Sequence, residues 1–256
     1  MSDLKKETEM MPKIKNYIEQ LRKLHPISYL NLPLKRKNLT ITEGWFYSQE
    51  EEKIHGFKIH GGIDFKAERG EPVYAAASGW ATSSYHNRPL KNKDGSPLKY
   101  KEKPITMGMG YFIQIYHPEN GRYTQYGHLE KIVEKIPFAP PRKRKDTYHP
   151  YGYKIKPKDM QNSKYYVWIN QGELIGYVGD SGLTWGYQDY PQRPDPQKYP
   201  SWDEVHLHFE EFSRDKKGKK REQRDPFNIY NTFKYYPKNT YQIPKNTLWD
   251  FNDLNH

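Results

Sequence analysis

The feature that most constrains this fold is a series of short runs of β-branched and aromatic residues, each closed by glycine, proline or asparagine. Runs of this length and composition are typical of strands, and the turn residues between them favour antiparallel neighbours. The Asn-Gly pair within PENGRY predicts a hairpin. The sequence therefore predicts an all-β fold with an antiparallel β-sheet core. The expected strands lie within 38–47, 71–85, 110–117, 122–129, 164–169 and 173–179.

Other segments depart from this strand pattern. The segment PKIKNYIEQLRKLHP at 12–26 has apolar residues at helical spacing and a proline near each end, which predicts a short amphipathic helix. Two stretches rich in proline and tyrosine are too long for ordinary connections, and loops of this length are often functional. We expect an N-terminal helix and lead-in at 1–35, a domain at 36–230 with insertions at 137–164 and 184–203, and an aromatic extension packed on it at 231–256.

Composition limits the chemistry. The chain has 42 Lys plus Arg against 31 Asp plus Glu, a net charge of +11 that favours polyanionic surroundings such as an anionic cell wall. Its basic runs are not interleaved with aromatics on a recognisable nucleic-acid module, so we expect no nucleic-acid partner. There is no cysteine, so a metal site needs His, Asp or Glu ligands. No apolar run is long enough for a transmembrane segment, and the first residues lack the apolar region of a secretory signal.

The segment EVHLHFEEF at 204–212 places two histidines on one face of an expected strand. Side chains alternate along a strand, so His206, His208 and Glu210 point one way and the apolar residues between them point the other way. Two imidazoles on one rigid face can serve a single metal site. An exposed strand with two solvated histidines is the alternative for such a short motif taken alone.

The segment HGGIDF offers a second pair of candidate ligands, His60 and Asp64. The two intervening glycines would cost a helix about 2 kcal/mol relative to alanines. A straight strand would separate the pair by roughly 13 Å. We therefore expect a tight glycine turn that brings the imidazole and the carboxylate together at the start of a strand near Ile63.

One histidine of the HxH strand would complete a set of two histidines and one aspartate, which suits a catalytic zinc with an open fourth position. The spacing leaves open whether His206 or His208 is that ligand. His128, at the end of an expected strand, is a further candidate for acid and base chemistry.

Four motifs in order, HGGIDF, YGHLEKI, GELIGYVGDSG and HLHFE, resemble the lysostaphin-type M23 peptidase family of zinc metallopeptidases that act on peptidoglycan. The resemblance runs from about residue 39 to residue 230. It implies that His60, Asp64 and His208 bind one Zn²⁺ per chain. It also implies that His206 and His128 are the catalytic, non-ligand pair. Glu210 is a candidate to orient a ligand from the second shell.

The resemblance implies a zinc metalloendopeptidase that hydrolyses peptide bonds of peptidoglycan stem peptides or cross-bridges by a zinc-activated water. A non-catalytic module that binds peptidoglycan or a partner protein is the alternative from another class. The implied location is the cell envelope, periplasmic or extracellular. We expect the two insertions to form walls of the metal-bearing groove and to select the peptide that fits.

Overall fold

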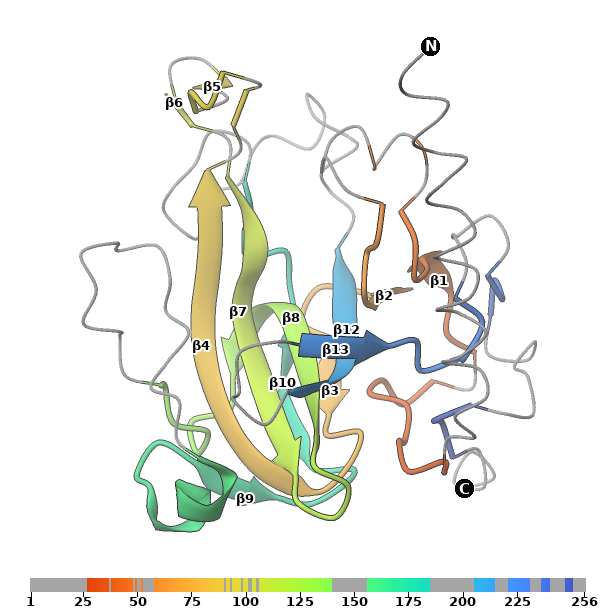
Figure 1. The fold of residues 1–256 in the computed structure, drawn as a ribbon, viewed down its shortest axis with the longest axis vertical. Helices are drawn as coiled ribbons and strands as arrows, with labels where there is room; N and C mark the ends of the chain where they lie inside the picture. The colour runs from red at the N-terminus through yellow and green to blue at the C-terminus, as the bar shows by residue number, and fades with distance from the viewer. Residues whose placement is uncertain are drawn as a thin grey trace.

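The computed structural model describes the strand-rich part of the chain (Figure 1). The predicted helix at 12–26 lies outside the described residues, as do most of both predicted insertions. The described residues are 27–36, 38–47, 49, 52, 58–89, 91–92, 94–97, 99–100, 103–104, 106–139, 156–184, 205–214, 221–230, 236–239 and 247–250.

Within these residues, one large antiparallel sheet forms the body of the protein. The elements are β1 Ile41–Glu43, β2 Ile63–Lys66, β3 Pro72–Tyr74, β4 Gly79–Pro89, β5 Lys99–Tyr100, β6 Lys103–Pro104, β7 Thr106–His117, β8 Arg122–Ile132, the 3₁₀ helix η1 Pro157–Asn162, β9 Val167–Ile169, β10 Leu174–Val178, β11 Leu183–Thr184, β12 His206–Arg214 and β13 Arg221–Arg224. The main order of the sheet is β1-β2-β12-β8-β7-β4-β9, while β10 pairs with β3 and β8, β11 with β7, and β13 with β12. A separate pair, β5 and β6, forms a small second sheet. The all-β prediction is confirmed.

The predicted hairpin joins β7 and β8. Its turn is closed by the amide of Gly121, which donates to the carbonyl of His117 at 2.9 Å. Gly121 has φ 70°, a left-handed conformation that glycine adopts without a steric cost. The Asn-Gly signal therefore identified a real turn between two long strands.

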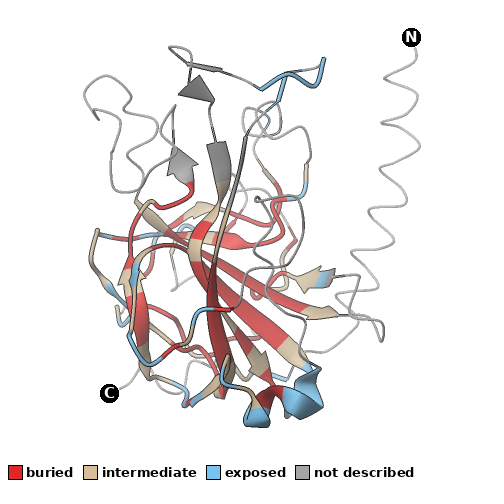
Figure 2. Ribbon diagram, turned by 90° about the vertical axis from the view of Figure 1, so that its left-hand side faces the viewer, coloured by how far each residue is buried: buried red, intermediate tan, exposed pale blue. Residues whose placement is uncertain are grey.

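The strands of the sheet are largely buried (Figure 2), and β2 and β12 direct apolar side chains into the core. Phe65 and Phe209 are fully buried there, and the indole of Trp249 packs against both rings, with centroids 6.1 and 5.1 Å away. The described part of the C-terminal extension thus anchors the strands that carry the HGGIDF and HxH motifs. Because Leu207 and Phe209 of β12 face this core, the histidines that alternate with them face the other way.

An aromatic row continues the opposite face of the sheet across five strands. Phe212, four residues after His208, is in register with Tyr123, and Tyr123 with Tyr116. The rings of Phe212 and Tyr123 stack at 5.2 Å. Trp80 and Trp168 complete the row on β4 and β9. The contacts between these rings join neighbouring strands on the face of the sheet that carries His208.

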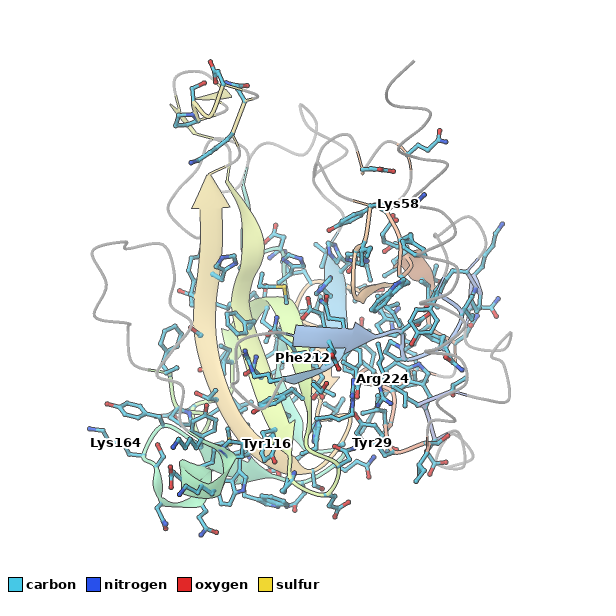
Figure 3. The ribbon with its side chains drawn as sticks, in the orientation of Figure 1. Tyr29, Lys58, Tyr116, Lys164, Phe212 and Arg224 are labelled. Carbon is cyan, nitrogen blue, oxygen red and sulfur yellow. The ribbon has the colours of Figure 1, made fainter. Side chains whose placement is uncertain are left out.

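A buried carboxylate ties the N-terminal lead-in to the sheet. Glu211 is fully buried and binds the guanidinium groups of Arg122 and Arg224. The hydroxyl of Tyr29 donates to the same carboxylate at 2.7 Å. Figure 3 shows Tyr29 and Arg224 in this region, although they come from opposite ends of the chain.

Candidate metal centre

A glycine turn brings His60 next to the start of β2. Gly61 has φ +78°, and the amides of His60 and Gly61 both donate to the carbonyl of Trp45, at 3.0 and 3.2 Å. A Cβ atom on Gly62 would lie 2.6 Å from Cε1 of His208, closer than real Cβ contacts. The turn expected from the sequence is therefore present, and its second glycine makes room for the imidazole of His208.

The pairing of β2 with β12 sets Asp64 directly opposite His208. Nδ1 of His208 lies 2.8 Å from Oδ1 of Asp64 and 3.0 Å from Nε2 of His60. Nε2 of His60 lies 3.5 Å from the same oxygen of Asp64. A tetrahedral zinc with bonds of about 2.0–2.1 Å holds its ligand atoms about 3.3 Å apart. The three atoms therefore have a spacing that suits one such ion.

The outer nitrogen of each ligand imidazole also has a partner. Nδ1 of His60 lies 2.8 Å from the carbonyl oxygen of Gly44, and Nε2 of His208 lies 3.3 Å from Oε1 of Glu210. When these nitrogens donate outward, the other nitrogen of each ring is left to face the cluster. Outer partners of this kind orient imidazole ligands in metal sites.

The charges of the cluster also suit a cation. Burial opposes ionisation of Asp64, but the nearby His60, His206 and His208 outweigh it and hold the pKa of Asp64 well below its usual range. Burial lowers the pKa of His60. Burial also acts to lower the pKa of His208, but Asp64 and Glu210 outweigh it and raise that pKa. Near neutral pH, Asp64 is therefore ionised and His60 neutral, while a metal would displace a proton from His208.

The predicted catalytic pair lies beside this trio. Nε2 of His206 is 3.6 Å from Oδ2 of Asp64, whereas His60 and His208 approach Oδ1. The ring of His128 lies 4.7 Å from the ring of His206 and 5.9 Å from that of His208. The structure thus brings together all five residues that the sequence singled out for metal binding and catalysis. Their individual roles remain predictions.

His128 sits in a strained backbone conformation. The sequence predicted that the strand ends near His128, but β8 continues to Ile132. The register against β7 shifts between Tyr111 and Ile113, which leaves an extra residue on β8, and His128 has φ 59°. Such a bulge re-aims a side chain, and left-handed backbone at a non-glycine residue costs about 1–3 kcal/mol. The bulge turns this histidine toward the cluster.

Ser181 supports this bulge, and sequence reasoning did not assign it a role. Its hydroxyl accepts the amide proton of Tyr111 at 2.8 Å and donates to the carbonyl of Leu129 at 2.5 Å, on the two strands where the ladder is interrupted. Its own carbonyl lies 2.9 Å from Nδ1 of His128. The GDSG sequence contained this serine, but only the tertiary structure shows what it contacts.

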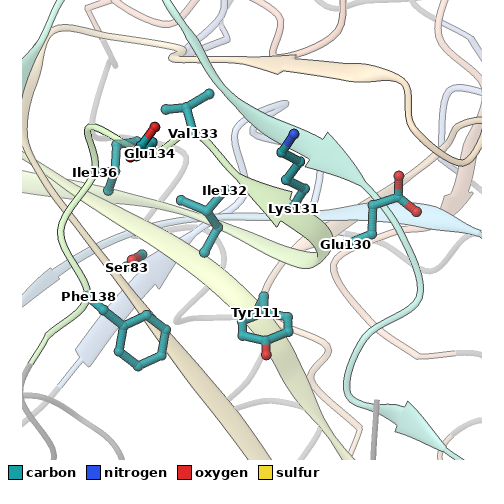
Figure 4. Close-up of a pocket in the computed structure, with 9 residues that line it drawn as sticks. All are labelled: Ser83, Tyr111, Glu130, Lys131, Ile132, Val133, Glu134, Ile136 and Phe138. Atoms are coloured by element: carbon teal, nitrogen blue, oxygen red, sulfur yellow. The ribbon is translucent and has the colours of Figure 1, made fainter. Parts of the chain in front are cut away.

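A separate hollow lies further along β8 (Figure 4). Its volume is about 320 Å³, and its lining contains none of the candidate ligands. The concentration of imidazoles and the ionised carboxylate therefore place the candidate chemistry at the metal centre rather than in this hollow. The hollow is lined by Ser83, Tyr111, Glu130, Lys131, Ile132, Val133, Glu134, Ile136 and Phe138.

Fold and site together define an all-β protein with a His-Asp-His group suited to a metal ion. Residues 58–136 match the model of Peptidase family M23. This match confirms the predicted resemblance to the family over residues 58–136. No curated protein matches the chain. Among the described residues, no helix is long and apolar enough to span a membrane.

Solved structures of peptidases are similar at low identity. Lysostaphin from Staphylococcus simulans is 16% identical, with 78% of this chain and 52% of that chain covered and a TM-score of 0.40. A zinc containing peptidase from Vibrio cholerae is 18% identical, with 73% of this chain and 37% of that chain covered and a TM-score of 0.37. This chain thus spans little more than a third of the Vibrio cholerae protein.

Proposed function

We propose that this protein is a zinc-dependent endopeptidase that hydrolyses peptide bonds of peptidoglycan stem peptides or cross-bridges. The observation that carries the proposal is the convergence of Nε2 of His60, Oδ1 of Asp64 and Nδ1 of His208 beside two further histidines. The match of residues 58–136 to a peptidase family supports the reaction class.

The three ligand side chains would hold the ion, and bound zinc supplies a Lewis acid for activating water and polarising a peptide carbonyl. His206 would accept the proton of the attacking water. Its Nε2 lies 3.6 Å from the ionised Asp64, which would stabilise the resulting imidazolium.

His128 has a complementary task. Burial lowers its pKa well below the usual value for histidine, so the ring is neutral at rest. Donation from Nδ1 to the carbonyl of Ser181 leaves Nε2 as the nitrogen available to the reaction. The proton that His206 takes from the attacking water is the one that the leaving amine must receive, and Nε2 of the neighbouring His128 would carry it there.

The proposed setting is the cell envelope. A net charge of +11 favours association with a wall that is rich in carboxylates and phosphates. The segments 137–164 and 184–203 are proposed as groove walls that select among wall peptides, because their ends connect strands close to His128 and His206.

The test is mass spectrometry of fragments that the zinc-loaded protein releases from purified peptidoglycans of several chemotypes. The proposal expects new amino termini at one peptide bond, loss of release with a chelator, and recovery with zinc. Glycan cleavage alone, or no cleavage of any chemotype by zinc-loaded protein, would contradict it. Sedimentation with peptidoglycan without cleavage would instead identify a non-catalytic binding module.

A further inference from the structure

A row of polar side chains crosses three strands of the sheet and ends at Glu210. Gln114 on β7 is in register with Gln125 on β8, and Gln125 with Glu210 on β12. Nε2 of Gln114 donates to Oε1 of Gln125 at 3.0 Å, and Nε2 of Gln125 donates to Oε2 of Glu210 at 3.3 Å. The hydrogen bonds therefore run in one direction, from β7 toward β12.

The other oxygen of Glu210 has two further partners. Oε1 lies 3.2 Å from Nε2 of Gln223 on β13 and 3.3 Å from Nε2 of His208. Glu210 is 6% exposed and Gln125 is 1% exposed. A buried carboxylate is costly unless donors satisfy it, so these amides determine where the carboxylate stays.

The direction of the row fixes the orientation of the Gln125 side chain. Its carbonyl oxygen is engaged by the amide of Gln114, so its NH₂ group must face Glu210. A flipped Gln125 would place an amide against an amide and an oxygen against a carboxylate, which would lose both hydrogen bonds. Gln114 therefore acts on Glu210 through Gln125.

We propose that Gln125, oriented by Gln114 and assisted by Gln223, is a positioning residue for the metal ligand His208. The amides of Gln125 and Gln223 hold the carboxylate of Glu210 so that it accepts the Nε2 proton of His208. The Nδ1 atom then faces Asp64 and His60 as the ligand atom. This inference rests on the zinc site of the proposed function, but it does not depend on the bond that is cleaved.

A purely structural role for the row is the competing explanation, because any buried glutamine needs partners. The two roles differ in what they predict for the metal. A structural amide affects stability alone, whereas a positioning amide also affects zinc affinity and the lifetime of the Nε2 proton of His208.

The test uses Gln125→Met, which keeps the length of the side chain and removes its donor. The matched control is Gln171→Met, because the side-chain amide of Gln171 donates to the backbone carbonyls of Tyr29 and Ala76 and not to a residue of the metal centre. Zinc affinity is measured by competition with a chelating dye. We expect about a 10-fold or greater loss for Gln125→Met and no change for Gln171→Met.

A second measurement follows the Nε2 proton of His208 by NMR in zinc-loaded protein with ¹⁵N-labelled histidine. We expect slow exchange in the wild type and fast exchange in Gln125→Met. If Gln125→Met does not fold, Gln114→Met at a partly exposed position should show both effects, more weakly.

Wild-type affinity and slow exchange in the folded variants would overturn the inference. A wild-type protein that binds no zinc would overturn it together with the proposed function. A protein that binds zinc and cleaves no peptidoglycan would refute the peptidase proposal alone, since the affinity of Gln125→Met still decides this inference.

Discussion

His208 and Asp64 are 144 residues apart in the sequence, yet they lie directly opposite each other on β12 and β2, with Nδ1 and Oδ1 2.8 Å apart. The apolar neighbours Leu207 and Phe65 form the next pair in the same register and are fully buried. A shift of one residue would turn the histidine into the core and an apolar side chain out of it. Burial of one face thus holds the candidate ligands together on the other.

The first prediction concerns metal content. Purified protein supplied with zinc should contain about one zinc per chain, as two imidazoles and a carboxylate imply. Asp64→Ala and His208→Ala should each abolish this binding, measured by elemental analysis after gel filtration. His117→Gln is the control, because His117 is buried but bonds to Ser78 and Thr124. His117→Gln should keep its zinc. Equal zinc content in the wild type and all three variants would exclude this centre.

The two non-ligand histidines should behave differently from the ligands. His206→Ala and His128→Ala should retain zinc but lose turnover by about 10²- to 10⁴-fold, the usual effect of removing an acid or base group. Turnover is measured on the peptide fragment that the wild type cleaves, with zinc content determined on the same samples. Loss of zinc from either variant would identify that residue as a ligand.

Ser181 should affect catalysis through the bulge at His128. Ser181→Ala removes the hydroxyl that joins Tyr111 to Leu129, and it should lower the free energy of unfolding by about 1–3 kcal/mol. It should also lower kcat more than KM is raised, because the orientation of His128 changes. Urea unfolding and steady-state kinetics measure the two effects. Ser163→Ala, at a partly exposed turn, is the control and should change neither appreciably.

The turn before β2 should not tolerate a methyl group at its second glycine. A Cβ on Gly62 would approach Cε1 and Nε2 of His208 to 2.6 and 2.8 Å, so Gly62→Ala should weaken zinc binding by about 10-fold or more. Gly172→Ala is the control because its φ is +76° and its Cβ would meet no atom within 4 Å. It should cost about 1–2 kcal/mol of stability without changing zinc affinity. Tight zinc binding by Gly62→Ala would show that His208 is not confined there.

Glu211 should make the protein sensitive to acid. Burial opposes its ionisation, but hydrogen bonds from Arg224 and Arg122 outweigh burial and lower its pKa. A carboxylate with a lowered folded-state pKa contributes stability above its unfolded pKa of about 4.3, and this contribution disappears as the pH falls through the folded-state value.

Thermal unfolding between pH 7 and pH 3 measures this contribution. Glu211→Gln should lose about 3–5 kcal/mol at pH 7, because two arginines lose their buried partner, and the difference from the wild type should shrink toward pH 3. A constant difference across this range would show that the ionisation of Glu211 does not contribute.

Local signals in the sequence identified several parts of this protein. Alternation and turn residues predicted most strands and the hairpin at Gly121. The HGGIDF and HxH motifs pointed to His60, Asp64 and one of His206 and His208, and the family resemblance selected His208. These features depend on the conformations that neighbouring residues favour. The helix at 12–26 and most of both insertions lie outside the described residues, so those predictions stand untested.

The sequence by itself thus determined the strand pattern, the glycine turn and the supply of ligand types. Only the tertiary structure decided which nitrogen of His208 faces Asp64, how the bulge and Ser181 aim His128, and that Gln114 and Gln125 form a row ending at Glu210. The physical reason is that these relationships depend on the register between strands distant in the chain. Burial of the opposite face sets that register, and the conformational preferences of neighbouring residues do not predict it.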